Sequence, residues 1–198
     1  DVMAALKKSG LERNTIVVYT SDQGFFLGEK GWYDKRWFYE PSAGTPLIVR
    51  FPDKLSQGRR VSVPTSGVDM APTILEWAGL KAPLGMQGQS LNLLVRGAAT
   101  RRLPVYGHFY EDNDPDHKVP KYTAIATERW KLISYYELGE CELFDLQSDP
   151  TESRNLWLLP GNRGVKAEMA RKLASEMRRL KEDSQVIQKV EAVMVLQR

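Results

Sequence analysis

An acidic residue and an amide stand side by side where a short apolar run ends. The run covers residues 15–19, Thr-Ile-Val-Val-Tyr, and a Thr-Ser pair joins it to Asp22 and Gln23. A carboxylate oxygen next to an amide oxygen suits a hard divalent cation such as calcium or magnesium, and the glycines that follow let the backbone turn closely around it. We therefore predict that Asp22 and Gln23 bind a metal ion. The alternative is an ordinary Asp-Gln-Gly turn after a strand.

A lysine follows in a segment that is rich in aromatic residues. Lys35 lies between Asp34 and Arg36. Its aromatic neighbours are Trp32, Tyr33, Trp37, Phe38 and Tyr39. An ammonium group in such a place can meet the anionic group of a ligand. If the lysine ammonium lies opposite a bound metal ion, the two positive charges together form an anion-binding site. We predict that Lys35 meets an anionic group of a ligand; the alternative is a solvated surface lysine.

The elements that must position these residues follow from the apolar pattern. Residues 15–19 and 45–51 have the length and β-branched content of buried strands, and we expect them to share one sheet. In open α/β sheets ligands bind beyond the carboxyl ends of strands, which is where Asp22 and Gln23 stand. Three segments have the apolar spacing of helices: 2–9, 68–79 and 91–95.

The second half of the chain has short strands separated by turns. We predict strands over 103–110, 122–127, 131–137 and 142–146. Their close spacing favours hairpins, and therefore a small four-stranded antiparallel sheet. Residues 165–180 place their apolar side chains on one helical face, so that helix should cover the sheet, and the tail over 186–196 either packs or continues the helix. We place one domain at 1–100 and a second at 101–198.

Residues 15–49 resemble the sulfatase family of the alkaline-phosphatase superfamily. In that family a strand ends in Ser/Thr-Asp-His/Asn/Gln-Gly and continues through Leu-Gly-x-x-Gly, a Lys, Tyr-Glu and Thr-Pro-Leu-Ile-Val. Further matching segments follow in the family's order: VDMAPTILEWAGL, MQGQSLNLLVRG, TERWKLISYY and ELFDLQSDPTESRNL. The resemblance, which is greatest to glucosamine-6-sulfatase-like and iduronate-sulfatase-like members, implies the C-terminal portion of an alkaline-phosphatase-like α/β sandwich, followed by the small antiparallel sheet and its C-terminal helix.

The resemblance also implies a reaction. Sulfatases hydrolyse sulfate esters with a formylglycine made in a Cys/Ser-x-Pro-x-Arg motif, while calcium and basic residues hold the sulfate. Asp22 and Gln23 match two of the calcium ligands, with magnesium as a possible substitute, and Lys35 matches the lysine that contacts the sulfate. His117 matches a histidine near the sugar pocket, the alternative being a loop histidine that faces water. These assignments are what the family implies for this chain.

The nucleophile motif is not in this chain, because Cys141 is followed by Glu-Leu-Phe without the proline or arginine. We expect Cys141 to be structural, the chain alone to be catalytically incomplete, and the N-terminal half of the same protein to be its partner. The chain also departs from the family at Lys30, where relatives often carry histidine, and at Gly44 and Ala126, where they often carry arginine. Losing two arginines alters the substrate or marks a degenerate member.

The predicted function is that of a sulfuric ester hydrolase acting on a sulfated carbohydrate. Two alternatives stay open: a phosphoesterase or phosphonate monoester hydrolase of the same superfamily, and a non-catalytic carbohydrate-binding derivative. The family implies a periplasmic, extracellular or lysosomal location. The given residues show no signal-peptide pattern, and we expect the true N-terminus to lie upstream of Asp1.

Composition sets wider limits. The 198 residues are 42% hydrophobic and 27% charged, with a net charge of +3, which is ordinary for a globular protein. No nucleic-acid motif accompanies the positive charge, and no apolar stretch is long enough to cross a membrane. The single cysteine excludes a disulfide within the chain. Because only part of a parent sheet would be present, we expect an exposed apolar edge and self-association of the isolated chain.

Overall fold

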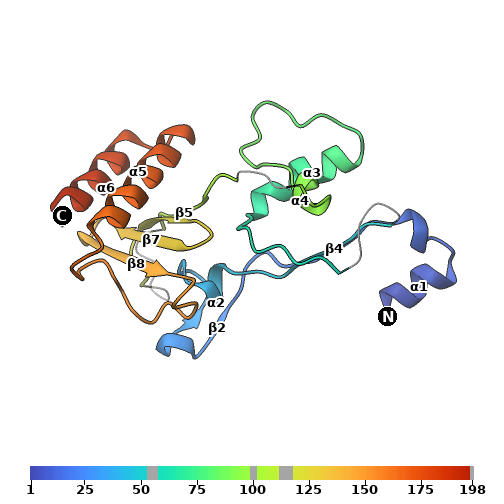
Figure 1. Cartoon of the computed structure of the whole chain (residues 1–198), viewed down its shortest axis with the longest axis horizontal. Helices are drawn as coiled ribbons and strands as arrows, with labels where there is room; N and C mark the ends of the chain where they lie inside the picture. Colours follow the sequence, from blue (N-terminus) through green and yellow to red (C-terminus); the bar gives the residue numbers. More distant parts are fainter. Residues whose placement is uncertain (53–57, 99–101, 112–117, 197–198) are drawn as a thin grey trace. The chain divides into compact units, whose positions relative to one another are not determined.

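The computed structural model describes residues 1–52, 58–98, 102–111 and 118–196. The chain, drawn in Figure 1, divides into two compact units. The first unit comprises Asp1–Gly24 and Gly44–Arg101, and the second comprises Phe25–Ala43 and Arg102–Arg198. Within the described residues, none of the helices has both the length and the apolar character needed to pass through a bilayer.

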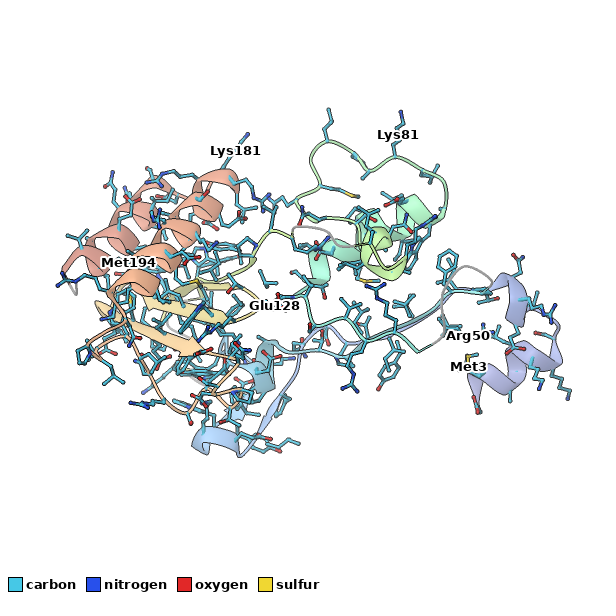
Figure 2. All side chains as sticks on the ribbon, in the orientation of Figure 1. Met3, Arg50, Lys81, Glu128, Lys181 and Met194 are labelled. Atoms are coloured by element: carbon cyan, nitrogen blue, oxygen red, sulfur yellow. The ribbon has the colours of Figure 1, made fainter. Side chains whose placement is uncertain are left out.

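The first unit contains an antiparallel pair of strands. β1 (Val17–Thr20) pairs with β4 (Leu47–Arg50), and Val17 lies opposite Arg50. The Arg50 guanidinium, labelled in Figure 2, donates a hydrogen bond to the carbonyl oxygen of Glu12 at 2.9 Å. This bond ties the end of β4 to the chain that leads into β1. The expectation that the two strands share a sheet is confirmed.

Short helices complete the first unit. They are α1 (Val2–Lys8), the 3₁₀ turns η1 (Glu12–Asn14) and η3 (Gly67–Asp69), α3 (Met70–Trp77) and α4 (Asn92–Val95). The buried Asp69 carboxylate accepts hydrogen bonds from the N–H of Ser66 at 2.9 Å and from that of Gln89 at 2.7 Å. One side chain therefore caps the turn before α3 and holds the loop before α4 against it. All three predicted helices are present.

Apolar side chains are exposed on the strand pair. Tyr19 of β1 and Ile48 of β4 lie opposite each other in the register and are 63% and 64% exposed. Two exposed side chains are too few to form the apolar edge expected from the sequence, so that edge stays a prediction. Self-association of the isolated chain stays a prediction.

The second unit is built on a four-stranded antiparallel sheet. Its strands are β5 (Val105–Phe109), β6 (Tyr122–Ala126), β7 (Trp130–Tyr135) and β8 (Glu140–Asp145). They lie in the sheet in chain order, so each connection is a hairpin. All four predicted strands and the predicted antiparallel pairing are confirmed. Because side chains alternate between faces along each strand, neighbouring residues such as Lys131 and Leu132 lie on opposite sides of the sheet.

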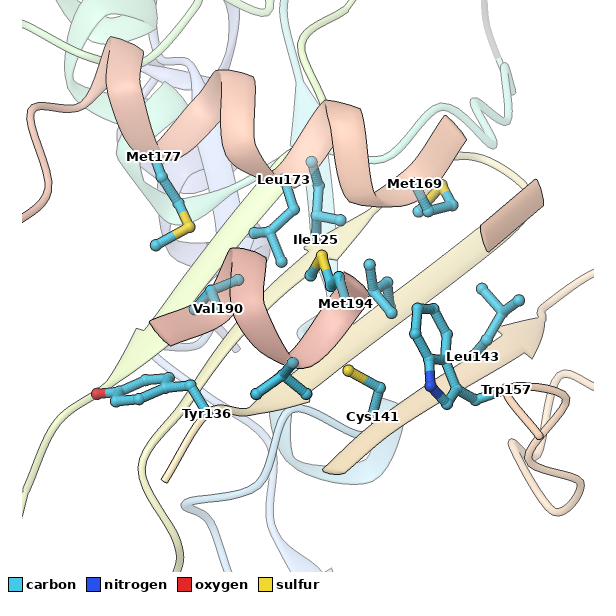
Figure 3. Packing of buried hydrophobic residues seen from close by; sticks show 12 residues of the cluster. Ile125, Tyr136, Cys141, Leu143, Trp157, Met169, Leu173, Met177, Val190 and Met194 are labelled. Carbon is cyan, nitrogen blue, oxygen red and sulfur yellow. The ribbon is translucent and has the colours of Figure 1, made fainter. Parts of the chain in front are cut away.

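Two helices cover one face of this sheet (Figure 1). α5 (Arg163–Arg179) and α6 (Ser184–Leu196) both contact its strands. Figure 3 shows the apolar core between the sheet and the helices, in which Ile125 and Leu143 of the sheet meet side chains of both helices. Leu132 belongs to the same core. Leu173 of α5 and Val190 of α6 are fully buried there. The single C-terminal helix expected from the sequence is thus a pair, because the tail has enough apolar residues to form its own packed helix.

The segment 25–43 covers the other face of the sheet. It contains β2 (Phe26–Leu27), η2 (Glu29–Gly31), β3 (Tyr33–Asp34) and α2 (Glu40–Ala43). Buried Phe26 and Tyr39 pack with Ile133 and Phe144 of the sheet. Although it precedes residue 100, this segment packs in the second unit, and the predicted domain boundary at 100/101 stays a prediction.

A glycine in the edge strand allows the close packing of this segment. A Cβ atom on Gly107 of β5 would lie 2.3 Å from the ring of Phe38. No real Cβ approaches another heavy atom that closely, so any larger residue would push the ring away. Gly107 therefore lets the chain beside Lys35 lie directly on the sheet.

Candidate functional site

The predicted metal-binding pair stands in a turn at the end of β1. The Asp22 carboxylate accepts hydrogen bonds from the N–H of Gln23 at 3.0 Å and from the hydroxyl of Ser21 at 3.3 Å. The Ser21 hydroxyl also donates to the carbonyl oxygen of Gln23 at 2.9 Å. Asp22 is exposed and Gln23 is half-buried. The structure therefore places a carboxylate and an amide at the surface end of a strand, where the sequence predicts them.

A metal ion would need more ligands than this turn offers. Among the residues that the structure describes, no three His, Cys, Asp or Glu side chains gather as a metal site requires. Calcium takes roughly six to eight oxygen ligands, so Asp22 and Gln23 would supply a minority of them. A carboxylate with an amide oxygen is still the donor chemistry that calcium and magnesium prefer. Metal binding at this turn stays a prediction.

Lys35 lies in an irregular stretch between β3 and α2, and its side chain is exposed. The residues on both sides of it are fixed. Asp34 has a positive φ of 134° and its carboxylate forms an ion pair with Arg36 at 2.6 Å. The carbonyl oxygen of Arg36 accepts a hydrogen bond from the Tyr122 hydroxyl of β6 at 2.9 Å. The backbone that carries Lys35 is therefore attached to the sheet.

Aromatic side chains surround this stretch, as the sequence indicates. The rings of Trp32 and Trp37 lie 4.5 Å apart, and Trp37 also meets Tyr135 of β7 edge-on at 5.9 Å. Phe38 packs near Tyr122, with 6.2 Å between the ring centroids. Such contacts are worth about 0.5–1.5 kcal/mol each beyond the apolar area they bury. The aromatic residues hold the segment on the sheet and leave Lys35 at the surface.

A buried charge network, which we did not predict from the sequence, lies under the same segment. Lys131 of β7 is 2% exposed and its ammonium is 2.6 Å from the carboxylate of Glu152, whose side chain is fully buried. The Lys131 ammonium also lies 3.3 Å from the carboxylate of Glu40 in α2. The signal in the sequence was a lysine inside an apolar strand, Trp-Lys-Leu-Ile, because a buried lysine needs an acidic partner.

A second acidic residue anchors Tyr39. The Tyr39 hydroxyl donates to the carboxylate of Glu142 in β8 at 2.5 Å, and the Tyr135 hydroxyl donates to the same oxygen at 3.2 Å. Burial raises the pKa of Glu142, although the two hydroxyls lower it in part. Burial and the neighbouring Glu142 also raise the pKa of Tyr39, so the hydroxyl stays a donor at neutral pH. The network fixes the start of α2 on the sheet.

Two histidines and a cysteine complete the candidates. His117 lies outside the described residues, and its predicted sugar contact stays a prediction. His108 of β5 lies 3.2 Å from the carboxylate of Glu182 and 3.2 Å from the hydroxyl of Tyr136, so its ring joins β5 to neighbouring parts of the second unit. Cys141 is buried in the helix-facing core, and burial raises the pKa of its thiol to about 11. A buried, protonated thiol is structural, as predicted.

The departures from the family fall in different places. Lys30 donates a hydrogen bond from its ammonium to the carbonyl oxygen of Glu152, and this ammonium lies 4.8 Å from the centre of the Tyr39 ring. Lys30 therefore contacts Glu152 and Tyr39, two residues of the buried network that holds the segment 25–43. Ala126 is buried at the end of β6 and Gly44 follows α2. Nothing in the structure explains the loss of arginine at these two positions.

The predicted site residues belong to different units. Asp22 and Gln23 lie in the first unit, whereas Lys35 lies in the second. Their approach to a shared anion therefore stays a prediction. What the structure establishes is local: a surface carboxylate and amide at a strand end, and an exposed lysine on a segment that is bound to a sheet.

Comparison with known proteins gives matches along most of the chain. Residues 28–180 match the family described as N-sulphoglucosamine sulphohydrolase, C-terminal. The chain is 41% identical over 182 residues to N-acetylglucosamine-6-O-sulfatase of Bacteroides thetaiotaomicron, and this match covers 89% of the chain and 31% of that protein. The chain thus spans about a third of the length of the curated relatives it matches.

Solved structures have the same fold. One is a protein in complex with its substrate, D-glucosamine-2-N,6-O-disulfate; it has a TM-score of 0.83 and 36% identity, over 93% of this chain and 38% of that one. Another, phosphonate monoester hydrolase of Agrobacterium radiobacter, has a TM-score of 0.78 and 26% identity, over 90% of this chain and 38% of that one. These likenesses confirm the α/β fold class, the C-terminal portion of an alkaline-phosphatase-like sandwich with its small sheet.

Proposed function

This chain belongs to the sulfatase family, in the part described as N-sulphoglucosamine sulphohydrolase, C-terminal, and on that premise we propose that the complete protein hydrolyses a sulfate ester on a glucosamine-type sugar. The observation that carries the proposal is the 41% identity to N-acetylglucosamine-6-O-sulfatase over 89% of the chain. The likeness to a structure that holds a disulfated glucosamine supports the same substrate class.

Lys35 would bind the sulfate group. Its ammonium is exposed on a segment that aromatic packing and buried ion pairs hold on the sheet. A cation held in place stabilises the negative charge on the transferring group without reorganising during the reaction. His117 would contact the sugar, in keeping with its place in the sequence.

Asp22 and Gln23 would supply two oxygen ligands of a calcium ion, with magnesium as the alternative. Their exposed position at the end of β1 and their donor chemistry fit a hard cation. When bound, the ion would neutralise charge on the sulfate ester and polarise its oxygens. The remaining ligands would come from the part of the protein outside this chain.

The nucleophile would also come from outside this chain. Sulfatases use a formylglycine, and Cys141 cannot replace it because its thiol is buried against the helices and its sequence lacks the required motif. This chain would therefore contribute sulfate binding and two metal ligands, and the part of the protein outside it would contribute the attacking group.

The reaction of the complete protein tests this proposal. We expect release of inorganic sulfate from glucosamine 6-sulfate, and a kcat/KM for an aryl sulfate that exceeds that for the matching aryl phosphate. Chelation of divalent metal should remove the activity, and added calcium should restore it. An enzyme that cleaves the phosphate ester faster than the sulfate ester would contradict the proposal.

A phosphonate monoester hydrolase is the second candidate, favoured by the TM-score of 0.78 to such an enzyme. Sulfate and phosphonate monoesters present similar tetrahedral anions, so one lysine and one metal ion can serve both. An aryl phosphonate included in the same assay separates the two reactions. A complete protein that hydrolyses none of the three esters would favour the non-catalytic, carbohydrate-binding alternative.

A further inference from the structure

The segment that carries Lys35 is held at both ends by a single residue. Glu152 lies in Ser-Asp-Pro-Thr-Glu-Ser-Arg-Asn-Leu, one of the segments that carry the family resemblance and that the proposed reaction leaves without a role. Its carbonyl oxygen accepts a hydrogen bond from the ammonium of Lys30. Its carboxylate accepts one from the N–H of Glu40 at 2.7 Å. Lys30 and Glu40 stand on either side of Lys35.

Glu152 is itself fixed by the charge beneath it. Its side chain is fully buried, and its Oε1 atom lies 2.6 Å from the Nζ atom of Lys131. A buried carboxylate is tolerated only where a cation or several donors compensate for its lost hydration. Lys131 supplies that cation from the centre of the sheet, and the Glu40 N–H supplies a donor. Lys131 of the sheet therefore fixes the position of the carboxylate, and the hydrogen bond from the Glu40 N–H fixes the start of α2 to that carboxylate.

Hydrogen bonds within the turn hold the backbone of Glu152 in its conformation. Glu152 has a φ of 53°, which is unusual for a residue with a side chain. Before it, the Asp149 carboxylate accepts hydrogen bonds from the hydroxyls of Thr151 and Ser153 and from the N–H of Arg154. These bonds close the turn, so that the unfavourable backbone conformation at Glu152 is held by its neighbours.

The residue that follows the turn attaches it to the sheet. Asn155 accepts a hydrogen bond from the N–H of Leu143 at 3.0 Å and donates one to the carbonyl oxygen of Cys141 at 3.2 Å. Leu143 and Cys141 are neighbours of Glu142 in β8. The turn that carries Glu152 is thus fixed to β8, the strand whose Glu142 binds Tyr39. Both contacts with β8 help to hold the segment 25–43 in place.

We propose that Glu152 is a positioning residue for Lys35: by binding Lys30 and Glu40 at once, and by resting on Lys131, it holds the lysine-bearing segment at a fixed place on the sheet. This proposal rests on the proposed role of Lys35 in sulfate binding. The consequence is that a change at Glu152, which would not touch the substrate, should weaken sulfate binding and slow catalysis.

The test compares two buried glutamates on opposite faces of the sheet in the complete protein. Glu152→Gln keeps the shape and one hydrogen-bond acceptor but removes the charge that pairs with Lys131. Glu176→Gln is the matched control, because Glu176 is 4% exposed, pairs with Arg179 at 2.8 Å and lies in α5. Both variants are assayed well below their melting temperatures for kcat, KM and inhibition by inorganic sulfate.

We expect Glu152→Gln to lower kcat/KM by about tenfold to a hundredfold, because small displacements of a catalytic group have effects of this size. Inhibition by sulfate should weaken as well. Glu176→Gln should lower the melting temperature but leave kcat/KM and sulfate inhibition within about twofold of wild type. Equal kinetic effects of the two variants, or a loss of stability at Glu152→Gln with unchanged kinetics, would overturn the proposal.

Hydrogen exchange separates this proposal from the proposed reaction. In Glu152→Gln, the amides of residues 28–43 should exchange faster than in wild type, whereas in Glu176→Gln they should not. Faster exchange in a protein that releases no sulfate would support the positioning role of Glu152 and reject the sulfatase reaction. Unchanged exchange over residues 28–43 would reject the positioning role of Glu152, whatever reaction the protein catalyses.

Discussion

The two faces of the four-stranded sheet are covered in different ways. On the helix-facing side, Ile125, Leu132 and Leu143 pack against the apolar residues of α5 and α6. On the opposite side, aromatic rings share the space with buried charges, among them Lys131 and Glu152. The same strands supply both faces, because their side chains alternate.

The difference separates stability from positioning. Fully burying a large apolar side chain contributes about 1.5–3 kcal/mol and depends little on direction, so the helix face suits a stable core. A buried ion pair contributes little net stability and is sensitive to geometry, so it suits the placement of a particular segment. The face with the charges is the one that carries Lys35. We infer that stability comes mainly from one side and the alignment of the site from the other.

The largest effect should follow from removing the buried cation. Lys131→Met leaves the Glu152 carboxylate buried without its partner, and such a change typically costs about 3–5 kcal/mol of unfolding free energy. Denaturant unfolding of the complete protein measures this loss. The kcat/KM should fall at the same time, because the Lys35 segment loses its support. A Lys131→Met variant that is stable and fully active would show that the buried charges do not position the Lys35 segment.

The adjacent residue gives the matched experiment on the other face. Leu132 is fully buried against the helices, so Leu132→Ala should cost about 2–5 kcal/mol of unfolding free energy. In this case kcat/KM, measured where the variant is fully folded, should stay near the wild-type value. A fall in kcat/KM as large as that of Lys131→Met would show that the helix face also aligns the site.

A smaller, pH-dependent effect is expected at Glu142. Burial raises its pKa in the folded protein above the value in the unfolded chain, about 4.3. The contribution of Glu142 to stability is then present below pH ~4.3 and is lost as the pH rises through the raised folded-state value. The melting temperature of Glu142→Gln should therefore rise relative to that of wild type as the pH goes from acidic to neutral. Parallel melting curves would refute this expectation.

The smallest effect is expected on the outer surface of the helix pair. Glu168 and Lys172 of α5 form an exposed ion pair at 3.3 Å, four residues apart. Glu168→Gln should change the unfolding free energy by less than about 0.5 kcal/mol and leave activity unchanged. Thermal melts at low and high salt check this. A larger loss would mean that surface charges, as well as the core, stabilise this face.

Much of the second unit is predictable from the sequence because its patterns are local. Turn residues separate the four strands, and the helical spacing of Met169, Leu173 and Met177 specifies the buried side of α5. The tail was harder to assign, since its apolar content allowed either packing or a longer helix. The structure shows a separate helix there, with Val190 fully buried.

The placement of residues 25–43 was not predictable in the same way. Their neighbours along the chain, β1 and β4, belong to the first unit, whereas the buried sheet residues that Phe26 and Tyr39 pack against begin only at Tyr122. The pairing of Lys131 with Glu152 also joins distant positions, and no local period reveals it. Asp22, Gln23 and Lys35 were identified by residue type and resemblance, and their roles stay predictions.

The most direct test of this account is the effect of Lys35 on sulfate chemistry in the complete protein. Lys35→Met should lower kcat/KM for an aryl sulfate by about a hundredfold to a thousandfold and weaken inhibition by inorganic sulfate, because it removes one stabilising charge from the site. The melting temperature should change by no more than about a few degrees, because contacts of an exposed side chain contribute little to stability. Lys172→Met, on the helix side, is the control. If both variants retain wild-type kcat/KM, Lys35 does not bind the sulfate.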